Sequence, residues 1–78
     1  MREEKPMSAL AIGETARVGK IGGDSAMCKR LRDLGLIEGT ATQCVLNSIG
    51  SAMSAYTIRG AVIAIRKEDA VKVSVYTS

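Results

Sequence analysis

The sequence predicts a mainly β domain: a small, partly closed barrel of about five short strands with one inserted helix at about residues 24–34. Three observations support this fold class. Short segments of alternating apolar and polar residues recur along the 78-residue chain and are separated by glycine turns. One segment alone has helical periodicity. There is no internal repeat, so we expect a single domain over residues 8–78.

The N-terminal part is expected to be a leader followed by the first strand. Residues 1–7 are charged and carry the only proline, Pro6, so we expect a flexible leader there. Gly13 marks a turn. Residues 15–21 alternate between apolar and polar side chains and predict a strand, which ends at a pair of glycines.

The predicted helix has both a start and a stop signal. Asp24 is a good N-cap because its carboxylate can accept hydrogen bonds from the free backbone donors of the first turn. Gly35 stands where a left-handed residue ends a helix, and Leu36 would then pack on Leu31 in a Schellman motif. The apolar residues form one stripe at helical spacing: Met27, Cys28, Leu31 and Leu34.

The remaining segments predict the rest of the sheet. Arg59 and Gly60 form a tight turn between two strands, and residues 67–70 form a single turn of helix. Residues 47–52 are predicted to be a loop. The expected strands cover residues 42–47, 53–58, 61–66 and 71–75.

The residue types argue against an enzyme. The chain has no histidine, which removes the commonest general base and metal ligand. Its carboxylates are scattered among turns and polar segments rather than paired in one place. The stretch at residues 13–20 has one residue too many between its glycines for a P-loop, and Ile21 replaces the required Ser or Thr. We therefore expect no catalytic site, no cofactor and no metal centre.

Two cysteines, Cys28 and Cys44, are too few for a small secreted scaffold. No signal peptide or membrane-length apolar run is visible. We therefore expect a cytoplasmic protein with two free, mostly buried thiols. A disulfide is the minority alternative, and a metal sensor that uses both thiols is a weaker hypothesis.

Nucleic-acid binding has little support in the composition. The net charge is only +3, and the one dense basic run, Lys29, Arg30 and Arg32, is interrupted by Asp33. Two tyrosines and no other aromatic residue offer few rings on which bases could stack. What remains is a small module that binds another protein through apolar and basic surface.

The chain resembles the ferrous-iron-transport protein A (FeoA) family over about residues 10–75. The most specific motif is R-L-x-x-L-G-L-x-x-G, at residues 30–39. The other matching features appear in the same order as in the family: Gly13, Ile21 to Gly23, Gly60, Ala64-Ile65-Arg66, Glu68, Ala70 and the valine-rich segment 71–75.

This resemblance implies an SH3-like β-barrel with an inserted helix. It also implies a cytosolic accessory of the membrane ferrous-iron permease, whose GTP-binding domain is the expected docking partner, so membrane association is indirect. A related barrel in iron-dependent repressors suggests the alternative of a stand-alone regulatory domain that acts on another protein or on nucleic acid. The family is loosely associated with transition metals. Unlike many members, this chain has no proline or acidic residue in the loop at residues 47–55, which leaves a different partner open.

The candidate partner-binding residues lie in the predicted helix, just after it, and at the predicted turn of Arg59 and Gly60. Each has a structural alternative: the leucines favour core packing, and the arginines can simply be solvated. Arg66 can instead pair locally with Glu68 or Asp69. The candidates are Arg30, Arg32, Leu34, Leu36, Ile37 and Arg59. The oligomeric state is left open.

Overall fold

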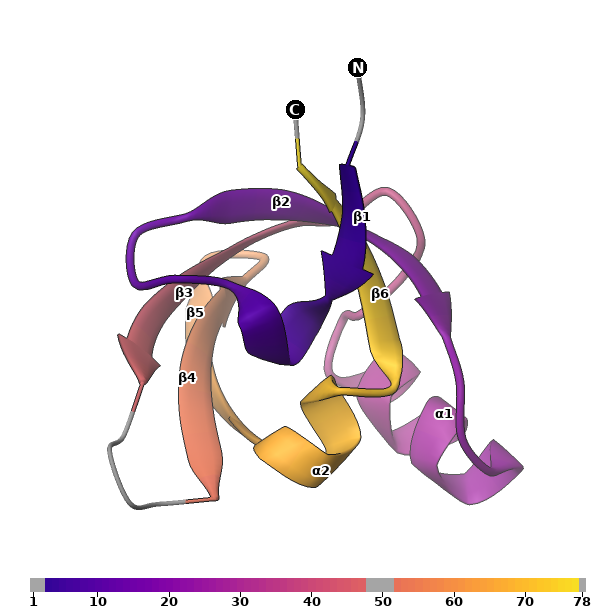
Figure 1. Ribbon diagram of the computed structural model, residues 1–78. Coiled ribbons are helices and arrows are strands. Elements are labelled where there is room, and N and C mark those ends of the chain that lie inside the picture. The colour runs from indigo at the N-terminus through magenta and orange to yellow at the C-terminus, as the bar shows by residue number, and fades with distance from the viewer. Residues whose placement is uncertain (1–2, 48–51, 78) are drawn as a thin grey trace.

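The computed structural model describes residues 3–47 and 52–77, and shows one curved antiparallel sheet with helices at one end (Figure 1). Its strands follow the order β1-β6-β2-β3-β4-β5. The elements are β1 (Glu3–Pro6), the short 3-10 helix η1 (Met7–Ala9), β2 (Thr15–Ile21), α1 (Ser25–Asp33), β3 (Ala41–Asn47), β4 (Met53–Ile58), β5 (Ala61–Arg66), α2 (Lys67–Ala70) and β6 (Val73–Thr77).

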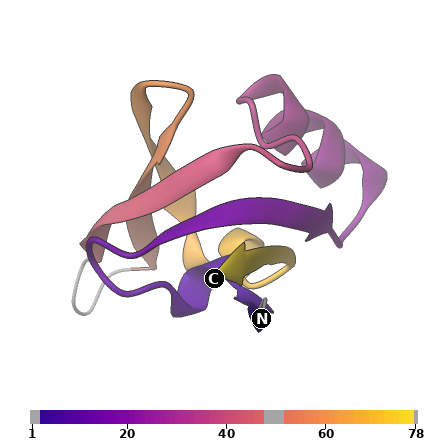
Figure 2. The same ribbon diagram turned by 90° about the horizontal axis from the view of Figure 1, so that it is seen from above.

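The mainly β fold with one inserted helix is confirmed. Figure 2 shows β2 and β3 side by side, with the β4–β5 hairpin projecting from them and α1 near its tip. The sheet curls without closing, because β1 and β5 stand at its two ends and do not pair with each other. In the described part of the chain, no helix is long and apolar enough to cross a membrane.

The prediction of a flexible leader is wrong for residues 3–7. Because these residues were not predicted to form a strand, about five strands were expected where six are found. Residues 3–6 form β1, which pairs with β6 from Glu3↔Thr77 to Pro6↔Ser74. This pairing joins the two ends of the chain, so no local pattern reveals it. Pro6 is tolerated because an edge strand has one side without hydrogen-bond partners.

The other strands lie close to their predicted positions. The last one begins at Val73 rather than Val71, because Val71 caps α2 and its N–H bonds to the carbonyl of Lys67 at 2.9 Å. Val73 and Val75 both point into the core, as the alternation predicts. Of the loop predicted at residues 47–52, residues 48–51 lie outside the described part of the chain.

The core lies inside the curved sheet and is almost wholly aliphatic. Its largest fully buried side chains include Met7, Leu10, Leu31, Leu36 and Tyr56. The hydroxyl of Tyr56 donates to the backbone carbonyl of Met7 at 3.3 Å, which ties η1 to β4. Burial raises the pKa of Tyr56 above its ordinary value, so the phenol stays protonated and keeps this donor.

An ion pair fastens β1 to the loop before β2. Lys5 Nζ lies 2.7 Å from Glu14 Oε2, and the N–H of Ala11 donates to Glu14 Oε1 at 3.0 Å. The hydrogen bond from Lys5, followed by that from Ala11, lowers the pKa of Glu14. The charged form of Glu14 is therefore more stable in the folded chain than in the unfolded chain.

We expect Glu14→Gln to lower the melting temperature at pH 7. The stabilisation is fully present above the ordinary glutamate pKa of about 4.3 and is lost as the pH falls through the lower folded value. The difference between wild type and variant should therefore disappear in acid. Thermal melts at several pH values measure it. Glu38→Gln is the control, since Glu38 is exposed and forms no salt bridge with a described residue. A difference that persists in acid would contradict the ion-pair explanation.

Candidate docking site

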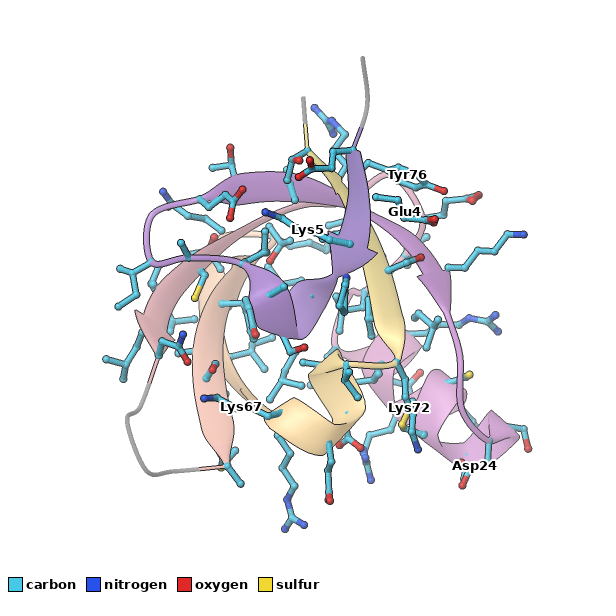
Figure 3. The ribbon with its side chains drawn as sticks, viewed as in Figure 1. Glu4, Lys5, Asp24, Lys67, Lys72 and Tyr76 are labelled. Atoms are coloured by element: carbon cyan, nitrogen blue, oxygen red, sulfur yellow. The ribbon has the colours of Figure 1, made fainter. Side chains whose placement is uncertain are left out.

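The start and the end of α1 are fixed by local contacts. Asp24, marked in Figure 3, accepts a hydrogen bond at Oδ1 from the N–H of Met27 at 2.8 Å. At the other end, the N–H of Leu36 reaches the carbonyl of Leu31 at 3.1 Å, and Gly35 bonds to Arg32 at 2.9 Å. These two bonds make the predicted Schellman motif, and Gly35 adopts the positive φ of 106° that it requires.

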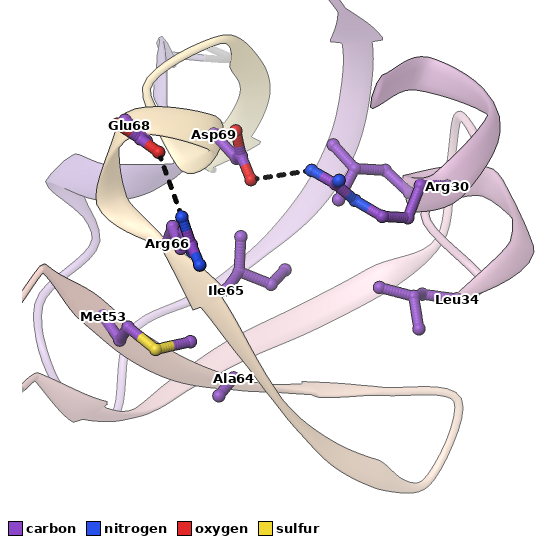
Figure 4. A pocket seen from close by; sticks show the side chains of 9 residues that line it. Arg30, Leu34, Met53, Ala64, Ile65, Arg66, Glu68 and Asp69 are labelled. Carbon is purple, nitrogen blue, oxygen red and sulfur yellow. Dashed lines mark hydrogen bonds and ion pairs between the residues drawn. The ribbon is translucent and has the colours of Figure 1, made fainter. Parts of the chain in front are cut away.

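One side of α1 forms a groove with β5 and α2, which we call the α1–β5 groove (Figure 4). It is open and has a volume of about 450 Å³. Its lining residues come from α1, β4, β5 and α2: Arg30, Leu31, Leu34, Met53, Ala64, Ile65, Arg66, Glu68 and Asp69.

Two ion pairs border this groove. Arg30 Nη2 lies 3.0 Å from Asp69 Oδ2, and Arg66 Nη1 lies 3.6 Å from Glu68 Oε1. The Arg30 side chain is 63% exposed, whereas that of Asp69 is only 17% exposed. Because one side of the Arg30 guanidinium is exposed, it can also reach a carboxylate of a partner while it remains paired with Asp69. The border of the groove therefore offers charges of both signs.

The apolar part of the groove includes side chains that the core does not cover. Leu34 is 40% exposed although it continues the apolar stripe of α1, because the core covers only the Leu31 end of that stripe. Met53 from β4 is also exposed. Leu36 is 0% exposed, so its side chain belongs to the core and cannot touch a partner directly.

Other candidate residues belong to a second groove, which we call the β2–α1 groove. It has a volume of about 370 Å³ and lies between the end of β2 and the segment that follows α1. Arg32 and the exposed Ile37 line it, together with Lys20 and Glu38. The structure therefore divides the predicted docking residues between two faces of the helix instead of bringing them together.

Arg59 lies at the β4–β5 turn with a positive φ of 53°. Its stem lies beside the end of α1: a Cβ atom added to Gly35 would be 2.9 Å from Arg59 Cδ. Arg59 is exposed and lines neither groove.

Sequence reasoning missed several residues of the α1–β5 groove. Met53 was not singled out, and Ala64 was named only as part of the family motif; both lie in the groove because β4 and β5 pair. Asp69 was considered only as a local partner of Arg66, but it pairs with Arg30, 39 residues away in the chain. The predicted local pair of Arg66 with Glu68 is present.

Both cysteines are free. Cys44 is buried as expected, and Cys28 is half-buried, with its Sγ 3.7 Å from the carbonyl of Ile21. Among residues 3–47 and 52–77, no three or more His, Cys, Asp or Glu side chains gather where they could hold a metal ion. The arrangement of the described residues is suited to binding a macromolecule through shallow grooves.

Comparison with known proteins places this fold in a family. The FeoA domain model matches residues 5–77. A crystal structure described as iron uptake regulatory protein (FeoA) has a TM-score of 0.86 and 25% identity, covering 96% of this chain and 100% of that one. FeoA of Stenotrophomonas maltophilia complexed with zinc, described as a prokaryotic SH3 domain protein, has a TM-score of 0.74 and 24% identity, covering 90% and 87%.

A second group of similar structures consists of metal-dependent repressors. A manganese-dependent transcriptional repressor has a TM-score of 0.90 but only 16% identity, and the match covers 100% of this chain and 44% of the repressor, which shows a shared fold alone. No curated protein sequence matches the chain. The family match extends over almost the whole chain, and the structure has the SH3-like architecture that the resemblance implies. The chain therefore belongs to the FeoA domain family.

Proposed function

We propose that this protein is a cytoplasmic accessory of ferrous-iron uptake. In this proposal it docks through the α1–β5 groove on the GTP-binding domain of a membrane ferrous-iron permease and modulates the assembly or activity of that permease. Membership of the FeoA family supports the role in iron transport. The similar Stenotrophomonas maltophilia protein has been suggested as a bacterial ferrous iron transport activating factor.

The observation that supports this groove most strongly is exposed Leu34 beside the exposed guanidinium of Arg30. Arginine next to apolar side chains in a concave surface is typical of the residues that dominate binding energy. A carboxylate on the partner could share Arg30 with Asp69, because the arginine side of the existing pair is exposed. The partner could thus add an ion pair at Arg30 while it covers Leu34.

We expect Arg30→Glu to weaken docking on the GTP-binding domain at least tenfold, which corresponds to about 1.4 kcal/mol. The new carboxylate would repel both Asp69 and the acidic side chain expected on the partner. Isothermal titration of the purified proteins measures the affinity, and circular dichroism checks the fold.

Two neighbouring variants make this test specific. Lys29→Glu makes the same change of charge on an exposed residue of α1 that lines neither groove. Arg32→Glu makes it in the β2–α1 groove. If Lys29→Glu weakens docking as much as Arg30→Glu, the effect is a general one of net charge. If only Arg32→Glu weakens it, the docking site is the β2–α1 groove. Unchanged affinity in folded Arg30→Glu protein would remove the α1–β5 groove from the proposal.

Action on nucleic acid has less support. Tyr56 is buried in the core, which leaves Tyr76 as the one other aromatic ring of the chain. Arg30 and Arg66 are each paired with an acidic side chain. A steep salt-dependent affinity for DNA or RNA would favour this alternative, and a flat titration at low salt would exclude it.

A further inference from the structure

The two grooves beside α1 differ in how their charges are matched. Both arginines of the α1–β5 groove are paired with acidic side chains of the chain itself, at 3.0 and 3.6 Å. The two cations of the β2–α1 groove, Lys20 and Arg32, are exposed, and neither forms an ion pair with a described residue. The β2–α1 groove therefore carries positive charge that the described part of the chain does not neutralise.

An irregularity in β2 places Lys20 in this groove. Between Val18 and Ile21 the register of β2 on β6 shifts, so that β2 has one extra residue there. The Ser74 hydroxyl closes this bulge, because it accepts a hydrogen bond from the N–H of Lys20 at 3.0 Å and donates one to the Lys20 carbonyl at 3.2 Å. Successive residues of a regular strand point to opposite faces, whereas a bulge re-aims a side chain. Lys20 and Ile21 can therefore both line the groove.

The opposite wall is formed by α1 and the segment that follows it. Two backbone hydrogen bonds hold this segment beside β2: Val18 donates to Thr40 at 2.9 Å, and Gly39 donates to Val18 at 2.7 Å. Figure 1 and Figure 2 both show the segment running next to the last part of β2. Arg32 lies on this wall, and Lys29, another exposed cation, is its neighbour at helical spacing. The groove thus has a cation on each wall and fixed sides.

The lining between these cations is apolar. Ile21 is half-buried and packs against the core, so its position is fixed. Ile37 is 51% exposed, although it lies only one residue from the fully buried Leu36. A partner that covers both isoleucines would gain apolar contact close to the two unpaired cations.

We propose that the β2–α1 groove binds an acidic segment of a partner protein, in which an apolar side chain lies between carboxylates. The apolar side chain covers Ile21 and Ile37, and the carboxylates on its two sides pair with Lys20 and Arg32. The charges that the chain leaves unmatched are thereby matched by the partner. This site is separate from the proposed docking on the permease domain, which uses the α1–β5 groove.

The remaining features of the groove favour a protein segment over nucleic acid or a lipid surface. Glu38 also lines the groove and would repel the regularly spaced phosphates of either alternative. A protein segment can place an uncharged residue beside Glu38. Bases need aromatic rings on which to stack, and the described lining has none. A flat lipid surface cannot enter a groove between a strand and a helix.

The first test is an NMR titration of the whole chain at low salt with a capped peptide, Glu-Glu-Leu-Glu-Glu. We expect saturable shifts at the amides of Lys20, Ile21, Arg32 and Ile37, with a Kd of about 0.1 to 1 mM, because exposed ion pairs each contribute little. The peptide Gln-Gln-Leu-Gln-Gln should bind at least tenfold more weakly. No saturable shifts, or equal affinity for both peptides, would overturn the proposal. The permease domain is absent, so failure here leaves the proposed function untouched.

Charge reversal tests the assignment to this groove. Lys20→Glu and Arg32→Glu should each weaken binding of the acidic peptide at least fivefold. Lys72→Glu makes the same change at an exposed lysine outside the groove and should have little effect. Lys-Lys-Leu-Lys-Lys should bind the double variant of Lys20 and Arg32 but not the wild type. Equal losses from all three single variants, or no binding of the lysine peptide to folded double variant, would overturn the assignment.

The apolar contact and the class of partner are tested in the same assay. Replacing the leucine of the acidic peptide by alanine should weaken binding, and this loss should be smaller in Ile37→Ala than in the wild type. An equal loss in both would contradict the contact with Ile37. A ten-residue oligothymidylate and vesicles of anionic lipid are titrated in parallel. Tighter binding of either one at the same amides would overturn the choice of a protein segment as the occupant.

Discussion

Replacing Leu36 by alanine is expected to lower the free energy of unfolding by about 3 kcal/mol. Leu36 is 0% exposed and occupies the position after Gly35 at which a Schellman motif packs back on its helix, near buried Leu31. The variant would leave a cavity where the end of α1 meets the sheet. A domain of this size has a total stability of about 5 to 10 kcal/mol, so the loss is a large part of it. Urea denaturation followed by circular dichroism measures the change.

Leu34→Ala is the matched control, because it removes the same atoms two residues earlier in the same motif. Leu34 is 40% exposed, so we expect its loss to cost less than about 1 kcal/mol. The two variants should therefore behave oppositely in the docking assay. Folded Leu34→Ala protein should bind the permease domain more weakly, whereas Leu36→Ala should retain binding at temperatures where it is still folded. Equal losses of stability would show that the exposed position of Leu34 is not maintained in solution.

The parts of the fold that the sequence predicts are those whose signals are local. Asp24 and Gly35 lie within a few residues of the groups that they cap, so the bounds of α1 follow from short-range chemistry. β1 has no such signal. Its four residues do not alternate, and it becomes a strand only because β6, at the opposite end of the chain, provides hydrogen-bond partners.

The candidate site was predicted less well, because it too depends on contacts between distant parts of the chain. The residue types were suitable, but which of them share a surface depends on how α1 lies across the hairpin. Arg30 and Arg32 are two residues apart in the chain and line different grooves. Periodicity places Leu34 on the apolar stripe of the helix, but it cannot show that the core leaves the C-terminal end of that stripe uncovered.

Gly35→Ala is expected to destabilise the domain by about 2 kcal/mol. A residue with a side chain pays about 1–2 kcal/mol for the left-handed region, and Gly35 has a φ of 106°. The added Cβ would also lie 2.9 Å from Arg59 Cδ and 3.1 Å from Ile58 Cγ2, so these side chains must shift. Thermal and urea denaturation measure the total cost.

Gly39→Ala separates the two contributions to this cost. Gly39 has a φ of 90°, and a Cβ there would meet nothing within 4 Å, so the variant has only the backbone cost. The excess cost of Gly35→Ala over Gly39→Ala therefore measures the contact with Arg59 and Ile58. Adding Arg59→Ala to Gly35→Ala should recover part of that excess, because the Arg59 stem no longer occupies the space. If there is no excess, the Arg59 side chain moves freely, and the end of α1 does not hold it in position.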